Sequence, residues 1–247
     1  FELGIPVFLE TGLTGISKDN GKVTGVRVDH KGVPMDIVAN RGVVLATGGF
    51  PQDAARRAEH MPHVRAGARH FSMSPSASAG DAISVALDAG GHLVESNSNA
   101  AFWTPVSLLP GKEGPRPFPH LFLDRAKPGV IAVGRDGRRF TNEAASYHDF
   151  VQGMLGAGHH SAWLICDHRA LRRYGLGAVR PFPAPYGHHL RSRYLKQGRT
   201  VEELARAIDV PVTELRDTIE RFGLDAEEGH DRAFGKGSTA YQTYLGD

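Results

Sequence analysis

The chain has 247 residues, 40% of them hydrophobic, and its 29 basic and 27 acidic side chains nearly cancel. This length can bury the core of one large domain or two modest ones, and the balanced charge argues against nucleic acid or an anionic membrane surface as a partner. No apolar run reaches the roughly 20 residues of a transmembrane helix, so we expect no membrane span. The single cysteine, Cys166, excludes an internal disulfide and is typical of a reducing compartment, which predicts a cytoplasmic protein.

The chain begins at Phe1 and enters a strand-like pattern within a few residues. It carries neither an initiator methionine nor a signal peptide at that point. We therefore expect an internal piece of a longer protein, which lacks the N- and C-terminal parts of its own chain as partners.

Residues 1 to about 50 predict a β-meander. Alternating apolar residues indicate strands at 7–16, 22–28 and 35–38, separated by the turn signals Asp19-Asn20-Gly21 and His30-Lys31-Gly32. Three consecutive strands joined by such short turns are expected to pair as neighbours in an antiparallel sheet.

A fourth strand is predicted at 42–46, where a continuous apolar run suits a strand that is covered on both faces. The run ends in small residues that allow the main chain to approach a ligand closely. These residues are Ala46, Thr47, Gly48 and Gly49.

Helices are predicted at 53–60 and 80–89, the second with Gly90-Gly91 as its end. Asp81 opens the second helix, where its carboxylate either caps the helix or contacts a ligand hydroxyl. Five prolines between 105 and 119 then predict a loop-rich stretch, and we expect a domain boundary just before residue 98.

A hairpin is predicted around an Asp-Gly turn in the middle of the chain. Val130–Val133 indicates a short buried strand, Gly134–Gly137 the turn and Arg139–Glu143 the returning strand. Tyr147 follows directly, so a phenol that can give or take a proton would stand just after a tight turn.

The last third of the chain predicts two helices. Thr200 and Glu203 form a possible capping box for the first, while Pro211 begins the second and Gly223 ends it. The glycine-rich residues 230–247 are expected to return to the first domain. Adjacent histidines such as His159 and His160 diverge on a helix or strand, so no metal site is expected.

The stretch Gly137–Tyr147 resembles the "G-R-R-F-x-N-E" signature of FAD-dependent flavoproteins of the fumarate reductase and succinate dehydrogenase superfamily, with Phe140, Asn142, Glu143 and Tyr147 carrying the match. Three further phrases, at 162–167, 174–177 and 234–237, fit the 3-ketosteroid dehydrogenase-like branch in order.

This resemblance implies an α+β fold in three parts. Residues 1–97 would be part of an FAD-binding domain, with the β-meander and the end of a parallel strand, residues 98–229 a mixed α/β capping domain, and residues 230–247 the return segment. FAD is the implied cofactor, and a small-molecule substrate the implied partner. The family's "A-T-G-G" turn would place residues 46–49 against FAD, and its "T-G-D-G" motif would place Asp81 there, although Ala82 replaces the second glycine.

The resemblance also implies roles for individual side chains. Tyr147 falls in register with a catalytic tyrosine of the 3-ketosteroid dehydrogenases, the alternative being a packed residue whose hydroxyl bonds to the backbone, and His148 could tune it. Arg125 and Glu143 are possible matches to substrate-binding residues. Phe102 and Trp103 stand where the fumarate reductases carry a histidine, which favours a bulky apolar ketone over a small dianion.

The expected activity is the α,β-dehydrogenation of a 3-ketosteroid-like ketone or another enone, with hydride transfer to flavin N5 and proton transfer to Tyr147. Two alternatives stay open: a fumarate reductase or succinate dehydrogenase type of flavoprotein, and a non-catalytic domain that keeps the fold. The chain contains no G-x-G-x-x-G sequence for the pyrophosphate. We therefore expect these 247 residues alone to be inactive and to bind FAD weakly.

Overall fold

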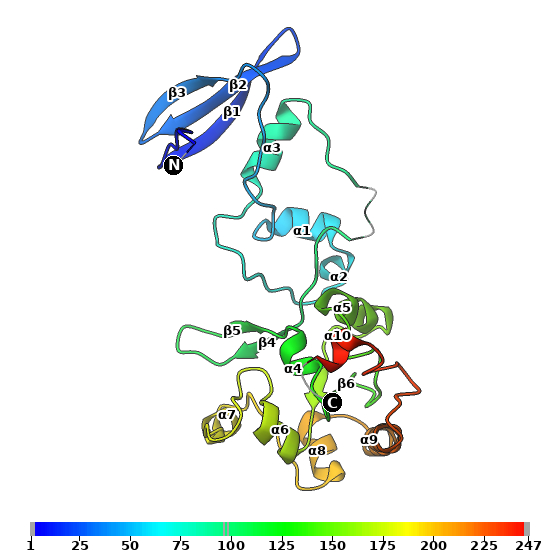
Figure 1. Cartoon of the computed structure of the whole chain (residues 1–247). Helices are drawn as coiled ribbons and strands as arrows, with labels where there is room; N and C mark the ends of the chain where they lie inside the picture. Colours follow the sequence, from blue (N-terminus) through cyan, green and yellow to red (C-terminus); the bar gives the residue numbers. More distant parts are fainter. Residues whose placement is uncertain (1–2, 96, 98, 245–247) are drawn as a thin grey trace. The chain divides into compact units, whose positions relative to one another are not determined.

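The computed structural model describes residues 3–95, 97 and 99–244, and the chain divides into two compact units. Unit 1 comprises Phe1–Gly67 and Ser72–Ala100, and unit 2 comprises Ala68–Phe71 and Ala101–Asp247. The division near residue 100 lies close to the boundary expected before residue 98. Both units combine helices with antiparallel strands (Figure 1), so the secondary structure is of the mixed kind that the sequence predicts.

The β-meander forms as predicted. The strands β1 (Thr11–Asp19), β2 (Lys22–His30) and β3 (Val33–Val38) pair antiparallel in the order β1-β2-β3 (Figure 1). Each turn has two consecutive residues with positive φ, 48° and 81° at the first turn and 53° and 83° at the second. Positive φ at both central residues is the conformation that joins tightly paired strands. The first strand begins at Thr11 rather than at residue 7, because β2 ends opposite Thr11 and offers no earlier partner.

The fourth strand predicted at 42–46 is wrong. These residues form no strand, and Val44 is 89% exposed. A strand needs a neighbour that accepts and donates main-chain hydrogen bonds, and the described part of unit 1 places none beside this segment. An apolar run predicts burial, but it does not supply the pairing partner.

The helices of unit 1 are α1 (Ala54–His60), α2 (Pro62–Arg65) and α3 (Asp81–Asp88). Asp53 caps α1, because its carboxylate accepts hydrogen bonds from two main-chain N–H groups in the first turn, at 2.9 and 3.0 Å. The predicted end of α3 is confirmed, since Gly91 donates to the carbonyl of Ala86 at 2.8 Å. Lys18 donates to the carbonyl of Ala89 at 2.6 Å and ties β1 to the end of α3.

The proline-rich stretch of unit 2 forms a hairpin rather than the expected loop. The strands β4 (Val106–Leu109) and β5 (Arg116–Pro119) pair antiparallel. Pro117 and Pro119 lie within β5 although they cannot donate a hydrogen bond. A sheet of only two strands tolerates them, because each strand has an outer edge that needs no donor. The short helix α4 (Phe122–Arg125) follows.

The strand predicted at 130–133 is confirmed as β6 (Ile131–Val133), which is fully buried. Its partner is β7 (Trp163–Ile165), however, and the predicted returning strand shrinks to one bridge between Val133 and Arg139. The turn itself forms, because Gly134 donates to the carbonyl of Arg138 at 3.0 Å.

The main core of unit 2 lies between β6, β7 and two helices, α8 (Val201–Ile208) and α9 (Val212–Glu227). Thr200 caps α8 as predicted, with its hydroxyl accepting from the N–H of Glu203 at 3.2 Å. Gly223 does not end α9, which continues to Glu227. Gly229, at φ +71°, supplies the left-handed residue that ends the helix instead.

The remaining helices of unit 2 are α5 (Tyr147–Gly156), α6 (His168–Tyr174), α7 (Gly187–Arg191) and α10 (Ala240–Thr243). Residues 230–244 fall in unit 2, and the expected return of residues 230–247 to the first domain stays a prediction. Asn142 holds them there by donating to the carbonyl of Phe234 at 3.1 Å.

No helix among the described residues is both long enough and apolar enough to cross a bilayer. Within the same residues, no three His, Cys, Asp or Glu side chains gather as metal ligands would.

Candidate active site

Tyr147 is the first residue of α5, so a helix rather than the expected strand presents it. The hydroxyl of Ser146 caps this helix, because it accepts from the N–H of Asp149 at 3.1 Å and donates to the same residue's carboxylate at 2.8 Å. Tyr147 is 39% exposed, although its large ring is apolar. A rigid helix start therefore holds an accessible phenol.

His148 joins Tyr147 to the predicted aromatic residues. Its Nδ1 accepts a hydrogen bond from the main-chain N–H of Trp103 at 3.1 Å, and its ring meets that of Phe102 edge to face with the centroids 5.2 Å apart. Since Nδ1 accepts here, the neutral ring carries its hydrogen on Nε2. Trp103 is buried, whereas Phe102 is 83% exposed. The structure thus places Phe102 and Trp103 against His148, the residue that follows Tyr147 in α5.

An ion network lies in the segment that leads to α5. Arg139 bonds both oxygens of Glu143, at 2.8 and 2.7 Å, and both oxygens of Asp231, at 2.9 and 2.8 Å. All three side chains are at most 6% exposed. Burial by itself disfavours the charged guanidinium, but the bonds to the two carboxylates outweigh it and raise the pKa of Arg139. Burial opposes ionisation of Asp231 as well, yet the bond to Arg139 lowers its pKa to about 2.

Arg125 and Lys236 bind main-chain carbonyls in the same network. Arg125 donates to the carbonyls of His120 and Glu143 at 3.0 and 2.6 Å, and its guanidinium lies 4.7 Å from the centre of the Phe150 ring. Burial lowers the pKa of Arg125 to about 10 and that of Lys236 to about 8.

Lys236 donates to the carbonyls of Arg125 and Lys127, at 3.3 and 3.1 Å, and to that of Val130. These cations and carboxylates therefore fix the main chain of two segments, 125–130 and 143–145.

The predicted substrate residues Arg125 and Glu143 are both 0% exposed. Their side chains bond to protein groups, so the structure does not present them to a small molecule. The network also depends on Arg139, Asp231 and Lys236, which the sequence did not indicate as site residues. Arg139 lies inside the recognised motif, which was a usable signal, whereas Asp231 had none.

The predicted cofactor residues lie in unit 1. Residues 46–49 are exposed, and a Cβ added at Gly48, whose φ is +83°, would meet nothing within 4 Å. Asp81 is the exposed first residue of α3, and Gly80 rather than Asp81 is the N-cap. Residues 46–49 thus offer an open main chain with small side chains, and Asp81 offers an accessible carboxylate. Both features are suited to contact with one part of FAD.

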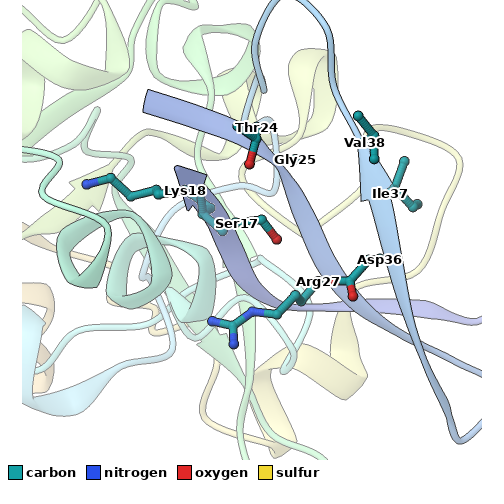
Figure 2. Close-up of a pocket in the computed structure, with 9 residues that line it drawn as sticks. Ser17, Lys18, Thr24, Gly25, Arg27, Asp36, Ile37 and Val38 are labelled. Atoms are coloured by element: carbon teal, nitrogen blue, oxygen red, sulfur yellow. The ribbon is translucent and has the colours of Figure 1, made fainter. Parts of the chain in front are cut away.

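Unit 1 also has an open cavity of about 610 Å³ on the β-meander. Figure 2 shows Lys18 and Arg27 from β1 and β2 at this cavity, with Asp36 to Val38 from β3. None of the predicted site residues lines it. Lys18 already bonds the end of α3, so the cavity gives no separate evidence for a ligand.

A second polar chain in unit 2 joins Asp124, His120, Ser107 and Tyr194. Successive distances are 2.5, 2.7 and 2.7 Å. The order resembles a hydrolytic triad, but the hydroxyl of Tyr194 bonds the serine, and a Cβ on Gly177 would lie 2.7 Å from both His120 and Tyr194. Protein atoms fill the space around this chain, so we interpret it as structural.

Comparison with known proteins gives concordant matches. A family model described as an FAD binding domain matches residues 1–244. The 4-oxocyclohex-2-ene-1-carboxylate 5-dehydrogenase of Sinomonas cyclohexanicum is 40% identical over 93% of this chain and 39% of its own length. The 3-oxosteroid 1-dehydrogenase of Mycobacterium tuberculosis is 34% identical over 99% of this chain and 44% of its own length.

Among solved structures, the 3-ketosteroid delta1-dehydrogenase from Sterolibacterium denitrificans in complex with 1,4-androstadiene-3,17-dione is similar. Its TM-score is 0.80 at 29% identity, over 100% of this chain and 44% of that chain. The chain thus spans about two fifths of the length of these relatives. The matches confirm the resemblance that the Gly137–Tyr147 motif predicts.

Proposed function

Because the chain belongs to the FAD binding domain family, we propose that the whole protein is an FAD-dependent dehydrogenase of cyclic ketones. The two curated relatives support this activity, since both names describe dehydrogenation of a ring that carries an oxo group. The observation that carries the proposal is the exposed Tyr147 at the start of α5, next in sequence to His148, whose ring contacts the exposed ring of Phe102.

The chemistry requires two hydrogens to leave neighbouring carbons. When bound, FAD would supply the acceptor for the hydride that leaves the carbon β to the carbonyl. Tyr147, once deprotonated, takes the proton from the α carbon, and the electron pair of that C–H bond becomes part of the new C=C bond. Tyr147 is therefore the proposed catalytic residue.

The two units have different proposed roles. Unit 1 is the partial FAD-binding domain, in which the open turn at 46–49 and Asp81 would hold part of FAD. Unit 2 is the capping domain, and it supplies the substrate-facing residues Phe102 and Tyr147. The buried Arg125 and Glu143 support this surface from the interior instead of touching the substrate.

The aromatic residues support an apolar ring ketone, and a 3-oxosteroid is the first candidate. Phe102 offers a large exposed apolar surface at 83% exposure. Burying such a ring against a hydrocarbon substrate contributes on the order of 2 kcal/mol. A small dianion such as fumarate would gain little from this contact and would require paired cations. A substrate of the oxocyclohexene carboxylate type would bind against the same face of Phe102 but would make fewer contacts with it.

The test is anaerobic reduction of the FAD in the full-length protein, followed by the loss of absorbance near 450 nm. The panel contains a 3-oxosteroid, a 4-oxocyclohexanecarboxylate and succinate, with fumarate-dependent reoxidation measured in parallel. We expect reduction by a cyclic ketone and release of its unsaturated product. Turnover of fumarate without any ketone would support the reductase alternative, and an inert flavin would support a non-catalytic protein.

Tyr147→Phe tests the assigned proton acceptor. Loss of a positioned proton acceptor lowers rates by about 100- to 10,000-fold. The matched control is Tyr174→Phe, a change of the same kind within α6. If Tyr147→Phe keeps normal turnover on its ketone while FAD stays bound, Tyr147 is not the proton acceptor.

A further inference from the structure

His148 connects two parts of unit 2 that lie 45 residues apart in the sequence. It is the second residue of α5 and follows Tyr147 directly. Its Nδ1 accepts the main-chain N–H of Trp103 at 3.1 Å. The segment at Phe102 and Trp103 lies outside the strands and helices, and this bond ties it to α5.

Ring contacts make the same connection. The rings of Phe102 and His148 meet edge to face, with their centroids 5.2 Å apart and an interplanar angle of 67°. Trp103 is buried, and its ring meets His70 at 6.2 Å. Phe102, by contrast, leaves 83% of its surface open, although a large apolar ring is favoured inside. Trp103 is therefore the anchor and Phe102 the exposed contact of this segment.

We propose that His148 is a positioning residue, which fixes the Phe102–Trp103 segment to the first turn of α5 so that Phe102 and Tyr147 form one substrate-facing surface. This inference rests on the proposed function for its substrate, a ring ketone. The Nδ1 acceptor is the part of the imidazole that performs this role. Without it, the main-chain N–H of Trp103 loses this acceptor, and the bond that ties the Phe102–Trp103 segment to α5 is lost.

Two substitutions separate the imidazole from its accepting atom. In His148→Asn, the amide oxygen stands where Nδ1 was and can still accept from Trp103. In His148→Leu, a side chain of similar size offers no acceptor. His160→Leu is the matched control, because His160 is an exposed histidine of the same unit.

The expected kinetic result in the full-length enzyme is an increase in KM of about tenfold in His148→Leu, with kcat changed less, because the substrate surface is misplaced. His148→Asn should return KM to within about threefold of wild type, and His160→Leu should leave it unchanged. If His148→Asn is as impaired as His148→Leu, or if His148→Leu equals wild type, the positioning role is wrong.

A spectroscopic measurement keeps this inference independent of the reaction. The protein is labelled with 5-fluorotryptophan, and Trp103→Phe assigns the ¹⁹F resonance of that residue. We expect the resonance to shift or broaden in His148→Leu and to keep its wild-type position in His148→Asn. An unchanged resonance in His148→Leu would show that the segment is held by other contacts, whatever substrate the enzyme uses. Failure of the ketone assay alone would instead remove only the proposed function.

Discussion

Replacement of Arg139 by methionine tests the ion network before α5 most directly. The guanidinium lies between Glu143 and Asp231, which are 0% and 4% exposed in their side chains. Methionine fills part of the space but leaves two buried carboxylates without the guanidinium that bonds both of them. It also removes a guanidinium that lies 5.0 Å from the Phe222 ring and 5.1 Å from the Phe234 ring.

The expected loss is about 3 to 5 kcal/mol in the free energy of unfolding, the usual cost of breaking a buried ion pair on one side. At a urea dependence of about 2 kcal/mol per molar, the midpoint of unfolding should fall by about 2 M. The deficit should shrink as the pH is lowered, because the two buried carboxylates that have lost Arg139 can then be neutralised by a proton.

Arg138→Met is the matched control. This neighbouring arginine also makes a 2.7 Å ion pair, with Glu214, but its side chain is 64% exposed. Exposed pairs contribute about 0 to 1 kcal/mol, so its urea midpoint should move by less than about 0.5 M. Urea unfolding followed by circular dichroism measures both variants. Equal midpoints for the two variants would refute the conclusion that the buried network stabilises unit 2.

Three further predictions concern other parts of unit 2. In wild type, the ionised Asp231 stabilises the fold above about pH 4, and this contribution is lost as the pH falls through its pKa of about 2. Asp231→Asn should therefore flatten the pH dependence of the urea midpoint between pH 4 and 2, and an unchanged slope would contradict the assignment. Burial raises the pKa of Cys166 to about 11, so Ellman's reagent should react at pH 8 much faster with the unfolded protein than with the native one. Gly177→Ala should cost about 1 to 3 kcal/mol more in urea unfolding than Gly158→Ala, since both glycines have positive φ but only the first Cβ meets neighbours.

Local patterns made most of the secondary structure predictable. The turns at Asn20 and Lys31 depend on glycine and on short-range geometry, so the β-meander follows from neighbouring residues. The same holds for the cap at Thr200. The strand predicted at 42–46 was wrong because a strand depends on a pairing partner, which no local pattern reveals.

The candidate site divides in the same way. The sequence indicated Tyr147 from its motif and Phe102 and Trp103 from their distance after Asp81, and the structure places these two aromatic residues against His148, the neighbour of Tyr147. The motif could not separate exposed from buried members, so Glu143 was expected to bind substrate. Its burial follows from Arg139 and Asp231, and a partner 92 residues away from Arg139 leaves no trace in sequence spacing.

The contacts that Asp231 and Lys236 make with residues 125–139 have a consequence for biosynthesis. Asp231, the second carboxylate that bonds Arg139, is synthesised 92 residues after Arg139. Lys236 is synthesised 106 to 111 residues after the residues whose carbonyls it bonds. At about 5 to 20 residues per second, a ribosome needs roughly 5 to 20 s to cover that distance. During this interval Arg139 has Glu143 but not Asp231 as a partner, so the segment before α5 completes its ion network only when residues 231–236 have been synthesised. A stalled or truncated product that ends before Asp231 would thus expose this segment to chaperones and proteases.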